Sequence, residues 1–117
     1  MLRWVLVLML SLAGSGELAA QGKGKGIRFW NLTTDTVSGL QLSPAGKNDW
    51  GPNQTANDKD GEVDHDERLR ITGVEAGTYD AKFTDTSGRT CLVRNIKIET
   101  GKIFSIEEKE LTSCTAR

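Results

Sequence analysis

The stretch TYDAKFTDTSGRTCLVRNIKI, residues 78–98, decides the fold class. In its first part, Tyr79, Ala81 and Phe83 alternate with polar side chains, which is the period of a half-buried β-strand. The Asp-Thr-Ser-Gly segment that follows has the composition of a turn, and the remainder has the composition of another strand. We therefore expect a β-hairpin here.

The second strand of this hairpin, residues 90–98, changes its apolar phase between Val93 and Ile96, which predicts a β-bulge near Arg94–Asn95. We expect residues 33–36 to form another hairpin turn. Four further runs have strand composition, at residues 27–32, 37–42, 68–74 and 102–107. Together these runs predict an all-β chain, a small antiparallel β-sandwich of about six to seven strands, with a small open barrel as the alternative.

The first twenty residues have the layout of a secretory signal peptide. A short basic start precedes an apolar run over residues 4–13, and small residues lead to Ala20, after which we expect cleavage. The apolar run is too short for a transmembrane anchor, which needs about twenty residues. We therefore expect an exported, periplasmic or extracellular protein with a flexible Gly/Lys leader, residues 21–26, and one domain, residues 27–117.

The two cysteines, Cys91 and Cys114, both lie after the expected signal peptide. An even number of cysteines in an exported chain predicts one disulfide bond, here between a central strand and the C-terminal tail. The net charge of −1 argues against a nucleic-acid partner, because such proteins carry a clear basic surplus.

Two motif patterns resemble known exported domains. The first pattern resembles the L-x-L-S-P … W-G-x-N/D … Y-D … D-x-x-G signature of small exported bacterial β-sandwich domains of unassigned function. It consists of GLQLSP over residues 39–44, NDWGPN over residues 48–53, Tyr79-Asp80, and an Asp-x-x-Gly at residues 85–88. The Gly-Val-x-x-Gly-x-Tyr run over residues 73–79 is similar to Ig-like and transthyretin-like modules. These resemblances imply a sandwich and an exported location, with no activity attached.

The acidic segment NDKDGEVDHDE, residues 57–67, belongs to a long interruption between strands. Against the EF-hand template, Asp58, Asp60, Asp64 and Glu67 occupy ligand positions, but Ala56 stands at the first of them. The segment is therefore not an EF-hand. A calcium-stabilised binding module that uses this loop stays an alternative to the simpler interpretation, a solvated acidic loop.

Catalysis finds little support in the sequence. His65 is the one histidine, and no Gly-x-Ser-x-Gly motif is present. A pair of carboxylates in a small hydrolase remains an alternative on residue types alone.

Two tryptophans of the expected domain have different predicted roles. Trp30 is in phase with Leu32 on a strand, so we expect it in the core. Trp50, in the long loop, is the candidate binding residue, either as a platform for a protein or glycan partner or as a lid over one end of the sandwich. The sequence thus predicts a monomeric, non-catalytic binding or structural module of the cell envelope.

Overall fold

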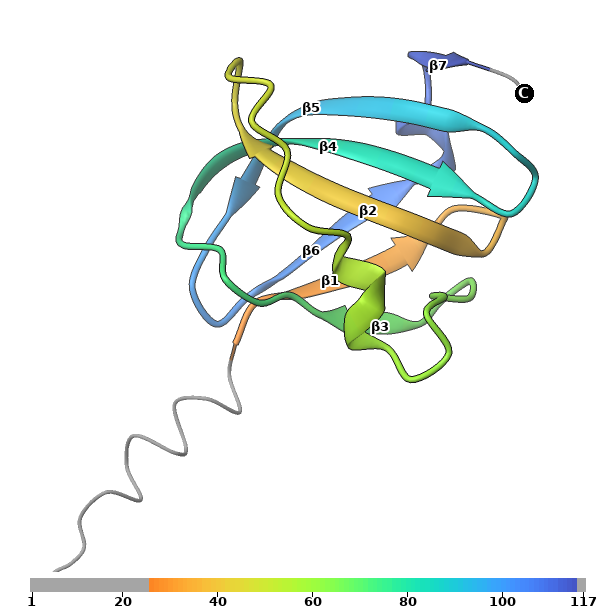
Figure 1. Ribbon diagram of the computed structural model, residues 1–117, viewed down its shortest axis with the longest axis horizontal. Helices are drawn as coiled ribbons and strands as arrows, with labels where there is room; N and C mark the ends of the chain where they lie inside the picture. Colours follow the sequence, from red (N-terminus) through yellow and green to blue (C-terminus); the bar gives the residue numbers. More distant parts are fainter. Residues whose placement is uncertain (1–25, 116–117) are drawn as a thin grey trace, which may run out of the picture.

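The computed structural model describes residues 26–115 (Figure 1). The expected signal peptide, residues 1–20, and most of the Gly/Lys leader lie outside the described residues. The elements are β1 (Arg28–Leu32), β2 (Val37–Pro44), η2 (Gln54–Asn57), β3 (Arg68–Arg70), β4 (Gly77–Asp85), β5 (Thr90–Ile98), β6 (Ile103–Glu107), η3 (Glu108–Glu110) and β7 (Cys114–Thr115). Across this part of the chain, none of the helices has the length and hydropathy of a membrane span.

The strands form two sheets that pack as a sandwich, which confirms the predicted fold class. The small sheet has the order β3-β1-β6 and the large sheet the order β2-β4-β5-β7. All pairs are antiparallel except β1 and β6, which run parallel. The expected hairpin at residues 33–36 is wrong, because β1 and β2 belong to different sheets and this segment crosses between them.

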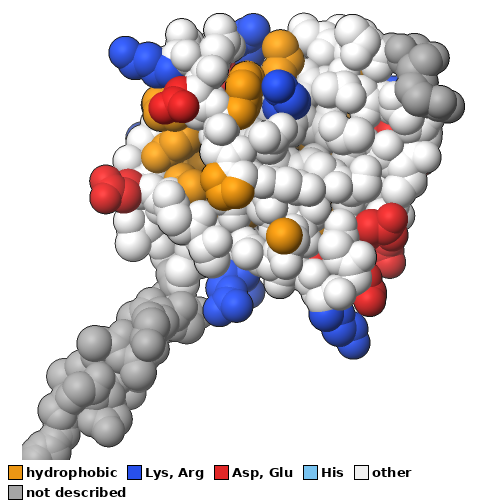
Figure 2. All heavy atoms as spheres, in the orientation of Figure 1, with side chains coloured by type: hydrophobic (Ala, Val, Ile, Leu, Met, Phe, Trp, Pro, Cys, Tyr) orange, Lys and Arg blue, Asp and Glu red, His pale blue; other side chains and the backbone are white. Residues whose placement is uncertain are grey.

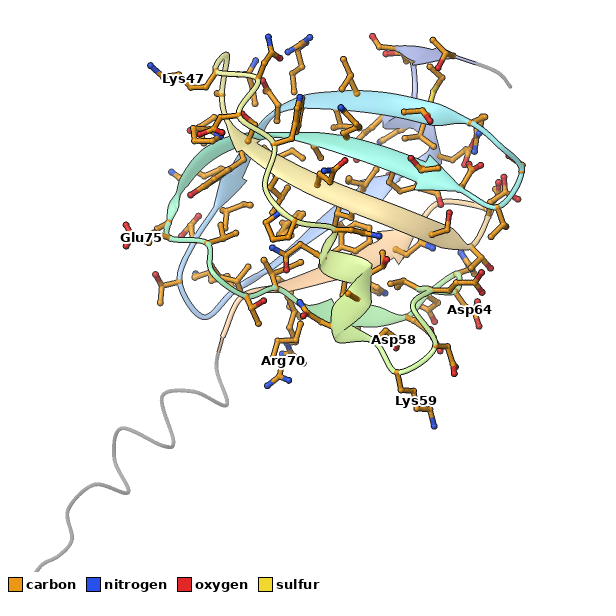
Figure 3. All side chains as sticks on the ribbon, viewed as in Figure 1. Lys47, Asp58, Lys59, Asp64, Arg70 and Glu75 are labelled. Atoms are coloured by element: carbon orange, nitrogen blue, oxygen red, sulfur yellow. A yellow bond between two sulfur atoms is a disulfide. The ribbon has the colours of Figure 1, made fainter. Side chains whose placement is uncertain are left out.

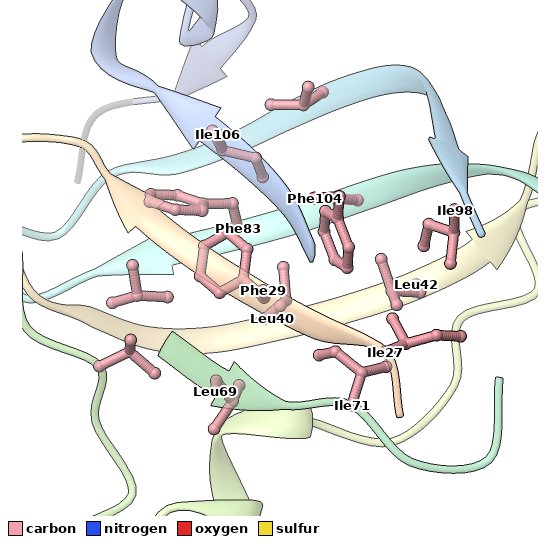
Figure 4. Close-up of a cluster of buried hydrophobic side chains, with 14 of the residues drawn as sticks. Ile27, Phe29, Leu40, Leu42, Leu69, Ile71, Phe83, Ile98, Phe104 and Ile106 are labelled. Atoms are coloured by element: carbon pink, nitrogen blue, oxygen red, sulfur yellow. The ribbon is translucent and has the colours of Figure 1, made fainter. Parts of the chain in front are cut away.

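Aromatic and aliphatic side chains from both sheets fill the core (Figure 4). Phe29 of β1 and Phe104 of β6 have ring centroids 5.5 Å apart, and Phe83 of β4 is fully buried. Ala81 is buried on the same side as Phe83, as the alternation in the opening stretch predicts. Burial of these apolar side chains is the main force that holds the two sheets together.

The predicted β-bulge is confirmed. Tyr79 pairs with Ile96 and Ala81 pairs with Val93, so that one residue of β4 faces Arg94 and Asn95 of β5. Asn95 has a positive φ of 61°, and the extra residue is accommodated by this left-handed backbone.

The predicted disulfide between Cys91 and Cys114 is present. It joins β5 to β7, which pairs with β5 over two residues. The sequence did not predict β7 as a strand, and it predicted β3 as longer than the three residues that pair with β1.

The long loop between β2 and β3 closes one side of the sandwich. Val63 is buried and exchanges two backbone hydrogen bonds with Val37 of β2, both 2.9 Å. The Asn53 side chain accepts a hydrogen bond from the Leu40 N–H, and the Gly51 N–H donates to the carbonyl of Leu42. The loop therefore covers the edge of β2, where unpaired backbone groups would otherwise face solvent.

Candidate functional site

An apolar cleft lies between the start of the long loop and the β3–β4 connection. Its volume is about 430 Å³, and it is lined by Leu42, Pro44, Asp49, Gly51, Pro52, Gln54, Thr72, Gly73, Val74 and Tyr79. Figure 2 shows a group of apolar side chains on the side of the molecule where Figure 3 labels Lys47 and Glu75. Most ligand pockets are concave and mainly apolar, with a few polar groups at defined positions.

Hydrogen bonds from two backbone N–H groups fix the wall of the cleft that the long loop provides. The Ala45 N–H donates to the carbonyl of Thr78, and the Asp49 N–H donates to Oγ of Ser43 at 2.8 Å. These bonds fold the loop back over the end of β2. Pro44 and Pro52 both line the cleft.

A side-chain clamp fixes the opposite wall. The amide of the buried Gln54 bonds to both backbone groups of Thr72, with Nε2 donating at 2.9 Å and Oε1 accepting at 3.0 Å. Gly73 follows with a φ of +71°, a conformation in which a side chain is strained. The Tyr79 hydroxyl donates to the carbonyl of Glu75 at 2.8 Å, so its ring is held at the rim of the cleft.

A buried carboxylate ties the loop to the bulge of β5. Asp80 accepts hydrogen bonds from the N–H groups of Gly46 and Asn95 and from the Arg94 guanidinium. The Gly46 hydrogen bond is the largest influence on the pKa of Asp80. Together with Asn95 and Arg94 it outweighs burial and lowers that pKa below its usual value. At neutral pH this carboxylate is therefore charged and anchors both segments.

Trp50, the candidate binding residue, stands in the chain between Asp49 and Gly51, two residues that line the cleft, and it is half-buried. The Lys82 ammonium lies 4.9 Å from the centroid of its indole ring, in a cation–π contact. Because Lys82 is on β4, Trp50 packs over the outer face of the large sheet. Its role in binding stays a prediction.

The candidate calcium ligands have separate local partners. Asp58 caps the Asp60 N–H at 2.8 Å, Asp64 accepts from the Thr36 hydroxyl, and Glu67 accepts from the Asp64 N–H at 3.0 Å. Figure 3 labels Asp58 and Asp64 on the lower right of the molecule. Within the part of the chain that the structure describes, no three His, Cys, Asp or Glu side chains are grouped so that they could hold a metal ion.

His65 lies in the same segment and bonds through Nδ1 to the carbonyl of Thr33 at 2.7 Å. This contact makes Nδ1 the donor, so the proton of a neutral ring is on that nitrogen. The bond joins the acidic segment to the end of β1, which is a structural role.

The predicted core position of Trp30 is wrong. Trp30 is half-buried and lies on the outer face of the small sheet, while its neighbours Phe29 and Asn31 are buried. The buried Asn31 is satisfied, since its Nδ2 donates to the carbonyls of Asp35 and Val63, each at 2.9 Å.

A cluster of four charged residues, which was not predicted from the sequence, joins several connections between strands. Arg89 pairs with Asp35 at 3.3 Å, with Asp85 at 2.9 Å and with Glu108 at 2.9 Å. The Arg89 hydrogen bond is the main cause of the lowered pKa of Glu108. Burial raises the pKa of Asp85, but hydrogen bonds from Ser87 and Arg89 outweigh it and leave that pKa below its usual value. The cluster joins three connections between strands.

No family model matches the chain, and neither a curated protein nor a solved structure matches it. The resemblance to small exported bacterial domains therefore stays a prediction.

Proposed function

We propose that the protein is an exported, non-catalytic binding module of the cell envelope, and that the apolar cleft receives an apolar side chain of a partner polypeptide. The observation that carries this proposal is the cleft itself, about 430 Å³ in volume. Val74 and Tyr79 are half-buried at its wall and pack against the core on their other side. Apolar surface that is rigidly supported and open to solvent is suited to binding.

The chemistry of the lining favours a polypeptide over a glycan. Pro44, Pro52 and Tyr79 present flat, stiff apolar surfaces, and aromatic residues are enriched where proteins bind other proteins. The exposed carboxylate of Asp49 lies at the same cleft and can accept a hydrogen bond from a backbone N–H of the partner.

The disulfide supports the exported location in this proposal. Cys91 and Cys114 are joined, and disulfides form and persist mainly in oxidising compartments outside the cytosol. The signal-like layout of residues 1–20 points to the same location.

Titration with blocked tripeptides tests the proposal. Millimolar Gly-Leu-Gly or Gly-Phe-Gly is added to ¹⁵N-labelled mature protein, with Gly-Ser-Gly as the polar control, and amide shifts are followed by NMR. We expect shifts for the Leu and Phe peptides at Gly51, Gly73 and Val74.

The matched variants are Val74→Arg, which places a charged chain in the cleft, and Ile103→Arg, which makes the same kind of change on β6, away from the cleft lining. We expect only Val74→Arg to abolish the shifts. Equal shifts with Gly-Ser-Gly, or shifts that persist in Val74→Arg, would contradict the proposal.

A further inference from the structure

Among residues 26–115, three arginines on the outer face of the small sheet have no acidic side chain paired with them. Arg28 of β1 and Arg68 and Arg70 of β3 are exposed. Their neighbours along the strands, Phe29 and Leu69, point into the core. The three guanidinium groups are therefore on one side of the sheet, and Figure 3 shows Arg70 pointing away from the sandwich. Within residues 26–115, the arginines that form ion pairs are Arg89 and Arg94, which lie at the large sheet.

Two of these arginines are direct cross-strand neighbours. Arg28 and Arg70 are opposite each other in the β1–β3 pair. The Ile71 N–H donates to the carbonyl of Ile27 in the adjacent position, and hydrogen-bonded and non-hydrogen-bonded pairs alternate. Arg28 and Arg70 thus form a non-hydrogen-bonded pair, in which side chains stand closest. Like charges at such positions destabilise a sheet, so this arrangement costs stability in the absence of an anion.

The third arginine is held in place by a tryptophan. The Arg68 guanidinium carbon lies 4.3 Å from the centroid of the Trp30 ring, and these two residues also pair across the strands. The Trp30 Nε1 donates to the Asp66 carboxylate at 2.9 Å, which fixes the ring. A stacked guanidinium loses less entropy on binding an anion, because its orientation is already restricted.

We propose that this surface, which we call the arginine face (Arg28, Trp30, Arg68 and Arg70), binds an anionic polysaccharide. Guanidinium groups bind carboxylate, sulfate or phosphate oxygens through paired hydrogen bonds. Arg68 and Arg70 are two residues apart on one strand, about 7 Å, and Arg28 is across from Arg70 at about 5 Å. A polymer with an anionic group on each repeat matches several closely spaced cations better than a single small anion does.

Two other kinds of polyanion, membrane surfaces and nucleic acid, fit this face less well. Membrane binding needs a sizeable exposed apolar area as well as charge. Among the described residues one large apolar side chain is exposed, Ile103 at 41%, which lies across from Arg28, and a single such side chain provides little of that area. Nucleic acid is disfavoured by the exported location proposed above, which the disulfide supports. This site is on the opposite sheet from Trp50 and does not depend on the apolar cleft.

Affinity electrophoresis and microscale thermophoresis with defined polymers test the proposal. The mature protein is titrated with alginate and with dextran sulfate, and neutral dextran is the uncharged control. We expect binding to both anionic polymers, no binding to dextran, and affinity that falls as salt is raised.

The test variant is Arg28→Gln/Arg70→Gln. The control is Lys47→Gln/Lys97→Gln, which removes the same charge from two exposed positions away from the small sheet, one in the turn after β2 and one on β5. We expect the arginine variant to bind about a hundredfold more weakly, roughly tenfold per arginine. Its melting temperature should be unchanged or higher, because the like-charge contact is removed. The control should keep the wild-type affinity.

Four results would overturn the proposal. They are absence of binding to both anionic polymers, an equal loss of affinity in the lysine control, tighter binding to phosphatidylglycerol vesicles or duplex DNA than to alginate, and a lower melting temperature of the arginine variant. The last result would mean that the arginines stabilise the sheet and are not held there for a ligand.

Discussion

Removing the buried carboxylate of Asp85 should destabilise the fold more than any exposed substitution. The side chain has no exposed surface and accepts four hydrogen bonds, from the backbone and hydroxyl of Ser87 and from the backbone and Nε of Arg89. Asp85→Ala leaves two backbone donors without partners, each of which costs about 1–3 kcal/mol. It also removes one of three acids around Arg89, whose remaining partners and partial exposure limit the loss.

The expected loss of unfolding free energy in Asp85→Ala is about 3 kcal/mol, equivalent to a decrease in melting temperature of roughly 12–24 °C for a domain of this size. Asp85→Asn keeps the shape and one acceptor, so we expect a loss of about 1–2 kcal/mol. Urea denaturation at pH 7, followed by tryptophan fluorescence, measures both values. A loss below about 1 kcal/mol for Asp85→Ala, with an unchanged m-value, would refute the reasoning.

The pH dependence provides an independent check on Asp85. Its pKa is lower in the folded protein than in the unfolded chain. The stabilisation is therefore complete above the unfolded value of about 3.9 and is lost as the pH falls through the folded value. The difference in stability between the wild type and Asp85→Asn should be constant near neutral pH and should shrink below about pH 4. A difference that grows on acidification would contradict this assignment.

Other predictions concern the disulfide, the hydrogen bonds of the Gln54 side chain to Thr72, and the acidic segment. Cys91→Ala/Cys114→Ala should lower the unfolding free energy by about 3 kcal/mol, as expected for a cross-link that spans 23 residues, and an unchanged denaturation midpoint would contradict this. Gln54→Ala should cost about 1–3 kcal/mol and speed hydrogen exchange of the Thr72 amide, while a protected Thr72 amide would argue against the clamp. Calcium at millimolar concentration should leave the melting temperature within about 1 °C, because the acids of residues 57–67 do not converge, and a larger rise would restore the calcium hypothesis.

Local patterns were sufficient to predict the positions of β1 to β6 and the bulge, but not the short β7 or the early end of β3. Ala81 and Phe83 alternate cleanly with polar residues, and the phase change before Ile96 has one simple structural explanation. The position of Trp30 could not be decided in this way. Phe29 and Trp30 are adjacent and both apolar, so either phase of the strand was compatible with a buried aromatic ring, and the buried Asn31 broke the expected pattern.

The connections and the cleft depend on contacts between distant parts of the chain. A hairpin turn and a crossover between sheets have the same local composition, so residues 33–36 gave no indication that β1 and β2 separate. The cleft combines Pro44 and Pro52 with Val74 and Tyr79, which only the fold brings together. The proline and glycine residues of these segments indicated irregular backbone but not a common surface.

Intermolecular NMR contacts test the central claim, that the apolar cleft receives an apolar side chain, most directly. With methyl-labelled mature protein and unlabelled Gly-Leu-Gly, we predict nuclear Overhauser effects between the peptide leucine methyls and the methyls of Leu42 and Val74, two residues of the cleft lining. The contacts should disappear in Val74→Arg and persist in Ile103→Arg. Peptide contacts to Ile103 or to other surface methyls, with none to Leu42 and Val74, would contradict the claim.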